Sequence, residues 1–132
     1  PGFRGTALSR DGGQTWEPPA LSRDLNEDPC QAGLIRWPGA ARPARLLFTN
    51  PDTGPSRGEG ARIRMTVRLS EDDGQTWPYA RLINPGPSAY SCPAVLPDES
   101  IALLFECGET GRYERIDLVR FSVAWLKEGL RV

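Results

Sequence analysis

Short apolar segments separated by turn residues run along the whole chain. One segment alternates between apolar and polar side chains, so Met65, Val67 and Leu69 would share one face of a strand. Residues 46–48 and 102–105 are continuously apolar instead, which is typical of strands buried on both faces. Together these patterns predict β-strands at residues 6–9, 33–37, 45–49, 63–69, 80–83, 91–96, 101–106 and 116–122.

Long helical periodicity is absent, and only residues 123–129 could form one terminal helical turn. The 13 prolines and 14 glycines fall mostly between the apolar segments, where they mark turns. The chain is therefore predicted to have an all-β fold.

One eight-residue motif occurs twice, each time after a predicted strand. Its aspartate can accept hydrogen bonds from turn amides, its glycine can take a positive φ, and its tryptophan can pack beneath the turn. The copies start at residues 9 and 70, which are 61 residues apart (70 minus 9). This spacing corresponds to one β-propeller blade of about 40 to 60 residues that contains an insertion. We interpret this Asp-box motif as a blade turn, and Asp11 and Asp72 as structural rather than catalytic or calcium-binding. The two copies of S-x-D-x-G-x-T-W are Ser9-Arg10-Asp11-Gly12-Gly13-Gln14-Thr15-Trp16 and Ser70-Glu71-Asp72-Asp73-Gly74-Gln75-Thr76-Trp77.

Composition excludes several classes of function. The formal net charge of −1 does not favour nucleic acid or an anionic membrane as a partner. The chain has no histidine, which removes Ser-His-Asp and Cys-His catalysis and the commonest zinc ligand. Cys30, Cys92 and Cys107 are too far apart for a zinc knuckle; one disulfide is possible, but buried free thiols are favoured. No apolar run approaches the ~20 residues of a membrane span, and we expect no metal or cofactor.

The second half of the chain carries further motifs with a shared resemblance. The segments 46–51, 62–70, 86–92, 103–106 and 113–116 resemble, in this order, the final blades of bacterial sialidases of glycoside hydrolase family 33. The similarity extends from about Gly2 to Leu126. It implies that residues 1–132 form the C-terminal blades, about half, of a six-bladed β-propeller. It also implies an exo-sialidase that hydrolyses terminal α-ketosidically linked sialic acids on glycoproteins, gangliosides or oligosaccharides.

The resemblance assigns the catalytic nucleophile to Tyr90, in Ser88-Ala89-Tyr90-Ser91. Sialic acid carries a carboxylate on its anomeric carbon, and this charge would repel an attacking aspartate or glutamate. A neutral tyrosine avoids the repulsion, and sialidases depart in this way from the two-carboxylate scheme of other retaining glycosidases. We expect both Asp-box turns to lie on one face of the propeller, opposite Tyr90.

Sialidases hold the substrate carboxylate with three arginines, which can each form two parallel charge-assisted hydrogen bonds. The position that resembles the third of these arginines is Arg62, ten residues before Asp72. Arg64 and Arg68 share the alternation of the same strand, so a slip of two residues would substitute Arg64 for Arg62.

Two further residues complete the predicted site. Gln31 resembles a substrate-binding position near the glycerol or N-acetyl group, although it could be an ordinary loop glutamine. Glu106 ends an apolar strand, where a carboxylate needs a partner, and the resemblance implies that it supports one arginine of the triad from behind. The alternative is a strand-end glutamate that faces water.

The resemblance also implies that other parts of the machinery lie outside this chain. These are the acid/base aspartate, the glutamate partner of the tyrosine and two arginines; Arg4 matches the strand after the second arginine and not that arginine. The chain by itself is therefore expected to be inactive, within a longer extracellular or cell-surface bacterial enzyme. The alternatives are a non-catalytic Asp-box propeller that binds glycans or proteins, and a trans-sialidase-type relative.

Overall fold

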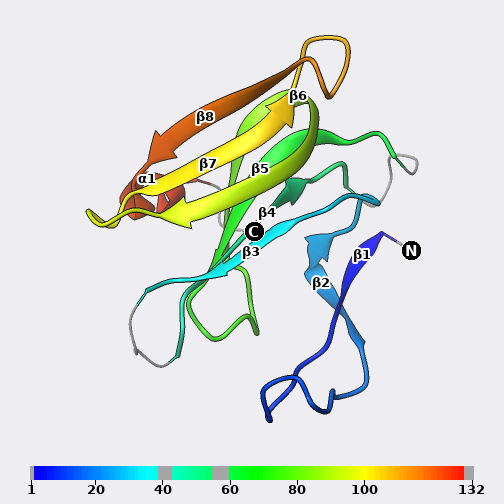
Figure 1. Ribbon diagram of the computed structural model, residues 1–132, viewed down its shortest axis with the longest axis vertical. Coiled ribbons are helices and arrows are strands. Elements are labelled where there is room, and N and C mark those ends of the chain that lie inside the picture. The colour runs from blue at the N-terminus through cyan, green and yellow to red at the C-terminus, as the bar shows by residue number, and fades with distance from the viewer. Residues whose placement is uncertain (1, 39–42, 55–59, 130–132) are drawn as a thin grey trace.

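The computed structural model describes residues 2–38, 43–54 and 60–129, which fold into β-strands and one short helix. Strands β1 and β2 form a hairpin, and β3 to β8 form one antiparallel sheet in sequence order. This sheet curls strongly, as the upper part of Figure 1 shows. The elements are β1 (Phe3–Thr6), β2 (Ala20–Asn26), β3 (Gly33–Arg36), β4 (Leu46–Pro51), β5 (Ile63–Ser70), β6 (Tyr79–Val95), β7 (Ile101–Cys107), β8 (Arg115–Phe121) and α1 (Val123–Lys127).

The long strand β6 explains how the sheet divides into blades. Its residues 79–87 pair with β5, and its residues 88–95 pair with β7. Strands β3 to β6 therefore make one four-stranded antiparallel blade, and the second half of β6 opens the next blade with β7 and β8. Because an Asp-box connects β1 to β2 as another connects β5 to β6, β1 and β2 match the last two strands of a preceding blade. The chain is thus an all-β partial propeller.

The main hydrophobic core lies between the two blades. Met65, Val67 and Leu69 share one face of β5 and are fully buried, as the alternation predicts. They pack against the inward-facing residues of β7, among them Leu103, and against Leu126 of α1. A smaller cluster on the other face of the complete blade joins Leu25, Phe48 and Trp77.

Several predicted strands need correction. Strand β4 is buried on both faces as predicted, but β7 alternates, with Leu103 fully buried and Leu104 47% exposed. The predicted strands 80–83 and 91–96 are one strand, because the prolines between them fall at the bend where β6 passes from one blade to the next. The strand predicted at 6–9 lies at Phe3–Thr6 instead, and its partner β2 was missed because its side chains are mostly exposed and lack a clear apolar pattern.

The two Asp-box turns have the local structure that the motif predicts. In each copy the aspartate accepts hydrogen bonds from the serine hydroxyl two residues before it and from the threonine amide and hydroxyl four residues after it, at 2.5 to 2.9 Å. The Thr15 hydroxyl and amide lower the pKa of Asp11 to about 2. Burial raises the pKa of Asp72, but the hydrogen bonds from Thr76, Ser70 and Gln75 together outweigh this effect and the pKa is lowered.

The two turns lie at the same lower end of the molecule, as the loops between β1 and β2 and between β5 and β6 in Figure 1 show. The register of β5 with β6 puts Tyr90 beyond the opposite end of β5. The tryptophans of the two motifs differ, however. Trp77 is 5% exposed and packs edge-on against Phe48, whereas Trp16 is 63% exposed, although its ring N–H donates to the Gly13 carbonyl of its own turn at 3.2 Å.

The three cysteines are all free thiols. Cys30 and Cys107 are buried, and burial raises the pKa of both thiols. Cys92 is exposed, so the expectation of buried thiols is wrong for this residue. In the part of the chain that the structure describes, no helix has the length and apolar character needed to cross a membrane.

Candidate active site

Side chains from four separate segments meet around Tyr90, near the bend of β6. Arg62 precedes β5, Gln31 precedes β3 and Glu106 lies on β7. Tyr90, Gln31 and Glu106 line an open pocket of ≈ 320 Å³ together with Ser91, Cys92, Leu104, Phe105 and Ile116. The structure therefore brings together all four residues that the sequence analysis predicts for the site, and their role toward a substrate stays a prediction.

The backbone around Tyr90 is held by side chains from neighbouring strands. The Tyr90 N–H donates to Glu106 Oε2 at 3.1 Å, and the N–H of Ser91 donates to Gln31 Oε1 at 3.0 Å. Gln31 Nε2 in turn donates to the carbonyls of Ser91 and Ala32, at 3.2 and 3.0 Å. These bonds fix the strand, while the Tyr90 side chain is 47% exposed and accessible.

Arg62 lies beside the Tyr90 ring, with its guanidinium carbon 5.8 Å from the ring centroid. Its Nε and Nη2 both donate to the carbonyl of Pro29, at 3.0 and 2.5 Å, and Nη1 donates to the Tyr113 hydroxyl at 2.8 Å. Partial burial lowers the pKa of Arg62, but Cys30, Tyr113 and Tyr90 beside it raise the pKa, and the net shift is upward. The guanidinium therefore remains a fixed cation next to the Tyr90 ring.

The hydrogen bonds of Arg62 leave part of its guanidinium available. An arginine side chain has five N–H donors, one on Nε and two on each terminal nitrogen. The bonds to Pro29 and Tyr113 use one donor on each of the three nitrogens. One N–H on Nη1 and one on Nη2 lie outside these three bonds, and the Tyr90 hydroxyl is near enough to act as a further hydrogen-bond partner that raises the pKa of Arg62. Two N–H groups are the number that a pair of hydrogen bonds to one carboxylate requires.

The backbone of Arg62 has an unusual conformation. Its φ is 44°, in the left-handed region that costs a residue other than glycine of order 1–3 kcal/mol and that often marks functional sites. Its carbonyl accepts from the N–H of Ser88, two residues before Tyr90, at 2.8 Å. Arg64 also has a positive φ of 66°, but its side chain is exposed, and its carbonyl accepts from the N–H of Asp52. Arg62, not Arg64, is the arginine that faces Tyr90.

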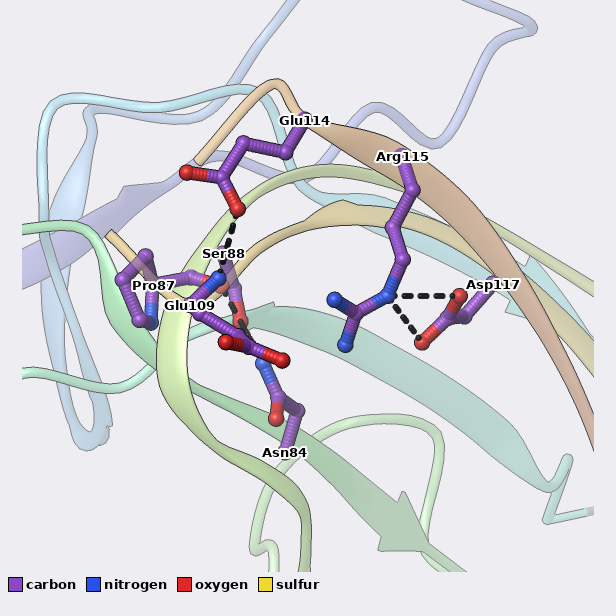
Figure 2. A network of polar contacts seen from close by, with 7 residues as sticks. All are labelled: Asn84, Pro87, Ser88, Glu109, Glu114, Arg115 and Asp117. Atoms are coloured by element: carbon purple, nitrogen blue, oxygen red, sulfur yellow. Dashed lines mark hydrogen bonds and ion pairs between the residues drawn. The ribbon is translucent and has the colours of Figure 1, made fainter. Parts of the chain in front are cut away.

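A polar network supports the segment that leads to Tyr90 (Figure 2). The amide of Asn84 donates to the carbonyl of Pro87 at 3.1 Å and to the hydroxyl of Ser88 at 3.0 Å. The turn between β7 and β8 lies against this segment, since the N–H of Gly108 donates to the Pro87 carbonyl.

That turn, residues 108–114, is closed by one carboxylate. Glu114 accepts from the amides of Glu109, Thr110 and Gly111 and from the Thr110 hydroxyl, at 2.5 to 3.2 Å. The Thr110 hydroxyl and these amides lower the pKa of Glu114 to about 2. The turn carries Tyr113 and therefore helps to hold the guanidinium of Arg62.

The structure adds two details to the predicted site. Glu106 accepts from the N–H of Tyr90, and within the described residues no arginine bonds to its carboxylate; its role behind an arginine of the triad stays a prediction, because the resemblance places the other two arginines outside this chain. Both amide N–H groups of Gln31 donate to backbone carbonyls, so only its side-chain oxygen could accept a further hydrogen bond from a ligand.

Two residues that contact Arg62, namely Asp28 and Tyr113, have no role that the sequence predicts. Asp28 precedes a proline, and Tyr113 lies within one of the motifs used for the resemblance, but neither position reveals its long-range partner. The described residues contain no group of three or more histidine, cysteine, aspartate or glutamate side chains that could hold a metal ion.

Comparison with known proteins gives a consistent result. No family model matches the chain. A sialidase of Micromonospora viridifaciens is 40% identical in an alignment of 130 residues that covers 95% of this chain and 18% of that protein. A Hadza microbial sialidase of known structure is 31% identical over 95% of this chain and 24% of that chain, with a TM-score of 0.74.

A more distant structure has the same fold. The intramolecular trans-sialidase of Ruminococcus gnavus superposes with a TM-score of 0.72 at 20% identity, over 96% of this chain and 29% of that chain. The present chain thus spans about a fifth of the length of the Micromonospora sialidase and under a third of either solved structure.

Proposed function

This chain belongs to the sialidase family, and from that premise we propose that it contributes the nucleophile and a carboxylate-binding arginine to an exo-sialidase. The substrates are sialylated glycans on glycoproteins, gangliosides or oligosaccharides, and the enzyme acts outside the cell or at its surface, where such glycans are accessible. The observation that carries the proposal is Arg62, a cation with one N–H on each terminal nitrogen outside its bonds to Pro29 and Tyr113, next to the exposed Tyr90 ring.

The chemistry of the substrate explains why these two residues belong together. Arg62 would bind the carboxylate on the anomeric carbon with one N–H from each terminal nitrogen, and this would orient that carbon toward Tyr90. The distance of 5.8 Å between the guanidinium carbon and the ring centroid leaves both groups within reach of one sugar ring. Because Arg62 neutralises the carboxylate and the phenol carries no charge, the nucleophile can approach without repulsion.

In the proposed mechanism the Tyr90 oxygen forms a bond to the anomeric carbon while the bond to the leaving glycosidic oxygen breaks. The phenol proton passes to a carboxylate, and the leaving oxygen takes a proton from an acid; both groups come from parts of the enzyme beyond this chain. Water then attacks the anomeric carbon and gives one proton to the conjugate base of that acid, while the bond to Tyr90 breaks and the carboxylate returns its proton to the phenol oxygen. Two displacements give net retention of configuration.

The test is Tyr90→Phe in the full-length protein. This change removes the attacking oxygen and keeps the ring, so the fold and the binding of the carboxylate should survive while kcat falls strongly. A 2,3-difluorosialic acid probe should label the wild-type peptide that contains Tyr90 and should leave the variant unlabelled.

Three results would count against the proposal. They are near-normal kcat in the variant, labelling of another residue in the wild type, and binding of sialosides without any turnover by the wild type. The last result would favour a non-catalytic glycan-binding propeller. The 132-residue chain alone is expected to show no turnover in the same assay, because the proposed mechanism needs an acid and a base that it does not supply.

A further inference from the structure

The buried carboxylate of Asp28 has no role in the proposed mechanism. Asp28 is 3% exposed and lies between β2 and β3. Its oxygens accept hydrogen bonds from the Thr53 hydroxyl at 2.5 Å, the Gly60 N–H at 3.0 Å and the Arg62 N–H at 2.5 Å. All three donors belong to the connection between β4 and β5 that leads to Arg62.

These bonds bring both ends of that connection to one point. Thr53 lies just after β4, and Gly60 and Arg62 lie just before β5. The next residue in the chain, Pro29, supplies the carbonyl that accepts from Nε and Nη2 of Arg62. The dipeptide Asp28-Pro29 therefore holds the main chain and the guanidinium of the same arginine.

We infer that Asp28 is a positioning residue, which sets Arg62 for the carboxylate of the substrate; this inference rests on the proposed function. The left-handed φ of 44° at Arg62 is unfavourable for a residue with a side chain, so the conformation persists only where its surroundings enforce it. On one side the Ser88 N–H binds the Arg62 carbonyl, and on the other side Asp28 binds the Arg62 N–H.

A carboxylate is well suited to this position. Two oxygens without protons can accept all three hydrogen bonds at once. Asparagine has a single acceptor oxygen. In Asp28→Asn, an N–H₂ group would therefore replace one of the two carboxylate oxygens and could not accept the hydrogen bonds made there. Loss of Asp28 would release the backbone of Arg62, and the guanidinium would no longer be oriented toward the carboxylate of the substrate.

The experiment measures how strongly the full-length protein distinguishes a charged ligand from an uncharged one. The probes are the α-methyl glycoside of sialic acid and its C1 methyl ester, whose dissociation constants are compared for wild type, Asp28→Ala and Asp28→Asn. Asp28→Ala should weaken binding of the carboxylate form by about 10- to 100-fold, as expected for a misplaced binding group. It should change ester binding by less than about twofold, because the ester gains little from Arg62.

Two further variants separate positioning from general stability. Asp24→Asn alters a carboxylate four residues away that accepts from the Trp77 N–H at 3.2 Å, next to an Asp-box turn, and should preserve the preference for the charged ligand. In an Arg62→Ala background, Asp28→Ala should have no additional effect on that preference, since the group that it positions is gone.

Several outcomes would overturn the inference. One is equal weakening of both ligands by Asp28→Ala, and another is an effect that persists in the Arg62→Ala background. If Asp28→Ala does not fold, Asp28→Asn decides: a reduced preference for the charged ligand supports the inference, and an unchanged preference refutes it. If Arg62→Ala itself leaves the preference unchanged, the proposed function fails as well, and the two failures are thereby distinguished.

Discussion

Replacing Arg62 with lysine keeps the positive charge and removes the planar fork, so this change isolates what the guanidinium geometry contributes. In the structure three of the five N–H donors bond to Pro29 and Tyr113, and one remains on each terminal nitrogen. A lysine ammonium has one nitrogen, which cannot form two parallel bonds to a carboxylate. It also cannot reproduce the contacts that orient the side chain.

The size of the effect follows from the number of hydrogen bonds. A hydrogen bond to a charged group contributes about 1.5–3 kcal/mol. Arg62→Lys exchanges two such bonds to the substrate for one, so the net loss is about 1.5–3 kcal/mol, or about 10- to 150-fold in kcat/KM. Since the carboxylate is bound in the ground state and in the transition state, much of the loss should appear in KM.

The assay is hydrolysis of a fluorogenic sialoside by the full-length protein, with Arg64→Lys as the matched control. Arg64 lies two residues away, also with a positive φ, but its side chain is exposed. Its replacement should change kcat/KM by less than about twofold, as for most surface substitutions. The reasoning is refuted if Arg62→Lys leaves kcat/KM nearly unchanged, or if Arg64→Lys loses as much activity as Arg62→Lys.

Two predictions concern the scaffold. The pKa of Glu114, about 2 against an ordinary value of 4.5, means that its stabilisation of the β7–β8 turn is complete above pH 4.5 and is lost as the pH falls toward 2. The amide resonance of Gly111 should therefore titrate with a midpoint near 2, and should not do so in Glu114→Gln; a midpoint near 4.5 would contradict the structure. A Cβ at Gly33 would lie 2.3 Å from Cδ of Pro93, so Gly33→Ala should cost about 1–3 kcal/mol or more and lower the melting temperature. Gly5→Ala, whose Cβ meets no described atom within 4 Å, is the control and should leave the melting temperature nearly unchanged.

Features whose hydrogen-bond partners or neighbours lie close along the chain could be predicted from the sequence. The Asp-box turns are the clearest case, because Asp11 and Asp72 find their hydrogen-bond donors within four residues. Alternation likewise predicted that Met65, Val67 and Leu69 share one face of β5, since successive side chains of a strand point to opposite faces. It did not predict that the other face, with Thr66, Arg68 and Ser70, is buried as well. The resemblance then singled out Tyr90 and Arg62, which the fold brings together from positions 28 residues apart (90 minus 62).

Features that depend on neighbours remote in sequence could be read from the folded chain but not from the sequence. Two copies of one motif differ because Phe48 and Leu25 cover Trp77, while Trp16 remains exposed. Strand β6 crosses its prolines without ending because each half pairs with a different blade.

The residues that hold the candidate site in place could not be predicted from the sequence either. Asp28 reaches Arg62 across 34 residues and Tyr113 reaches it across 51. Such contacts depend on how the blades curl and pack, and local propensity and periodicity carry no record of them. The sequence could therefore indicate which residues form the site, but the packing of the blades determines which side chains hold Arg62 in place.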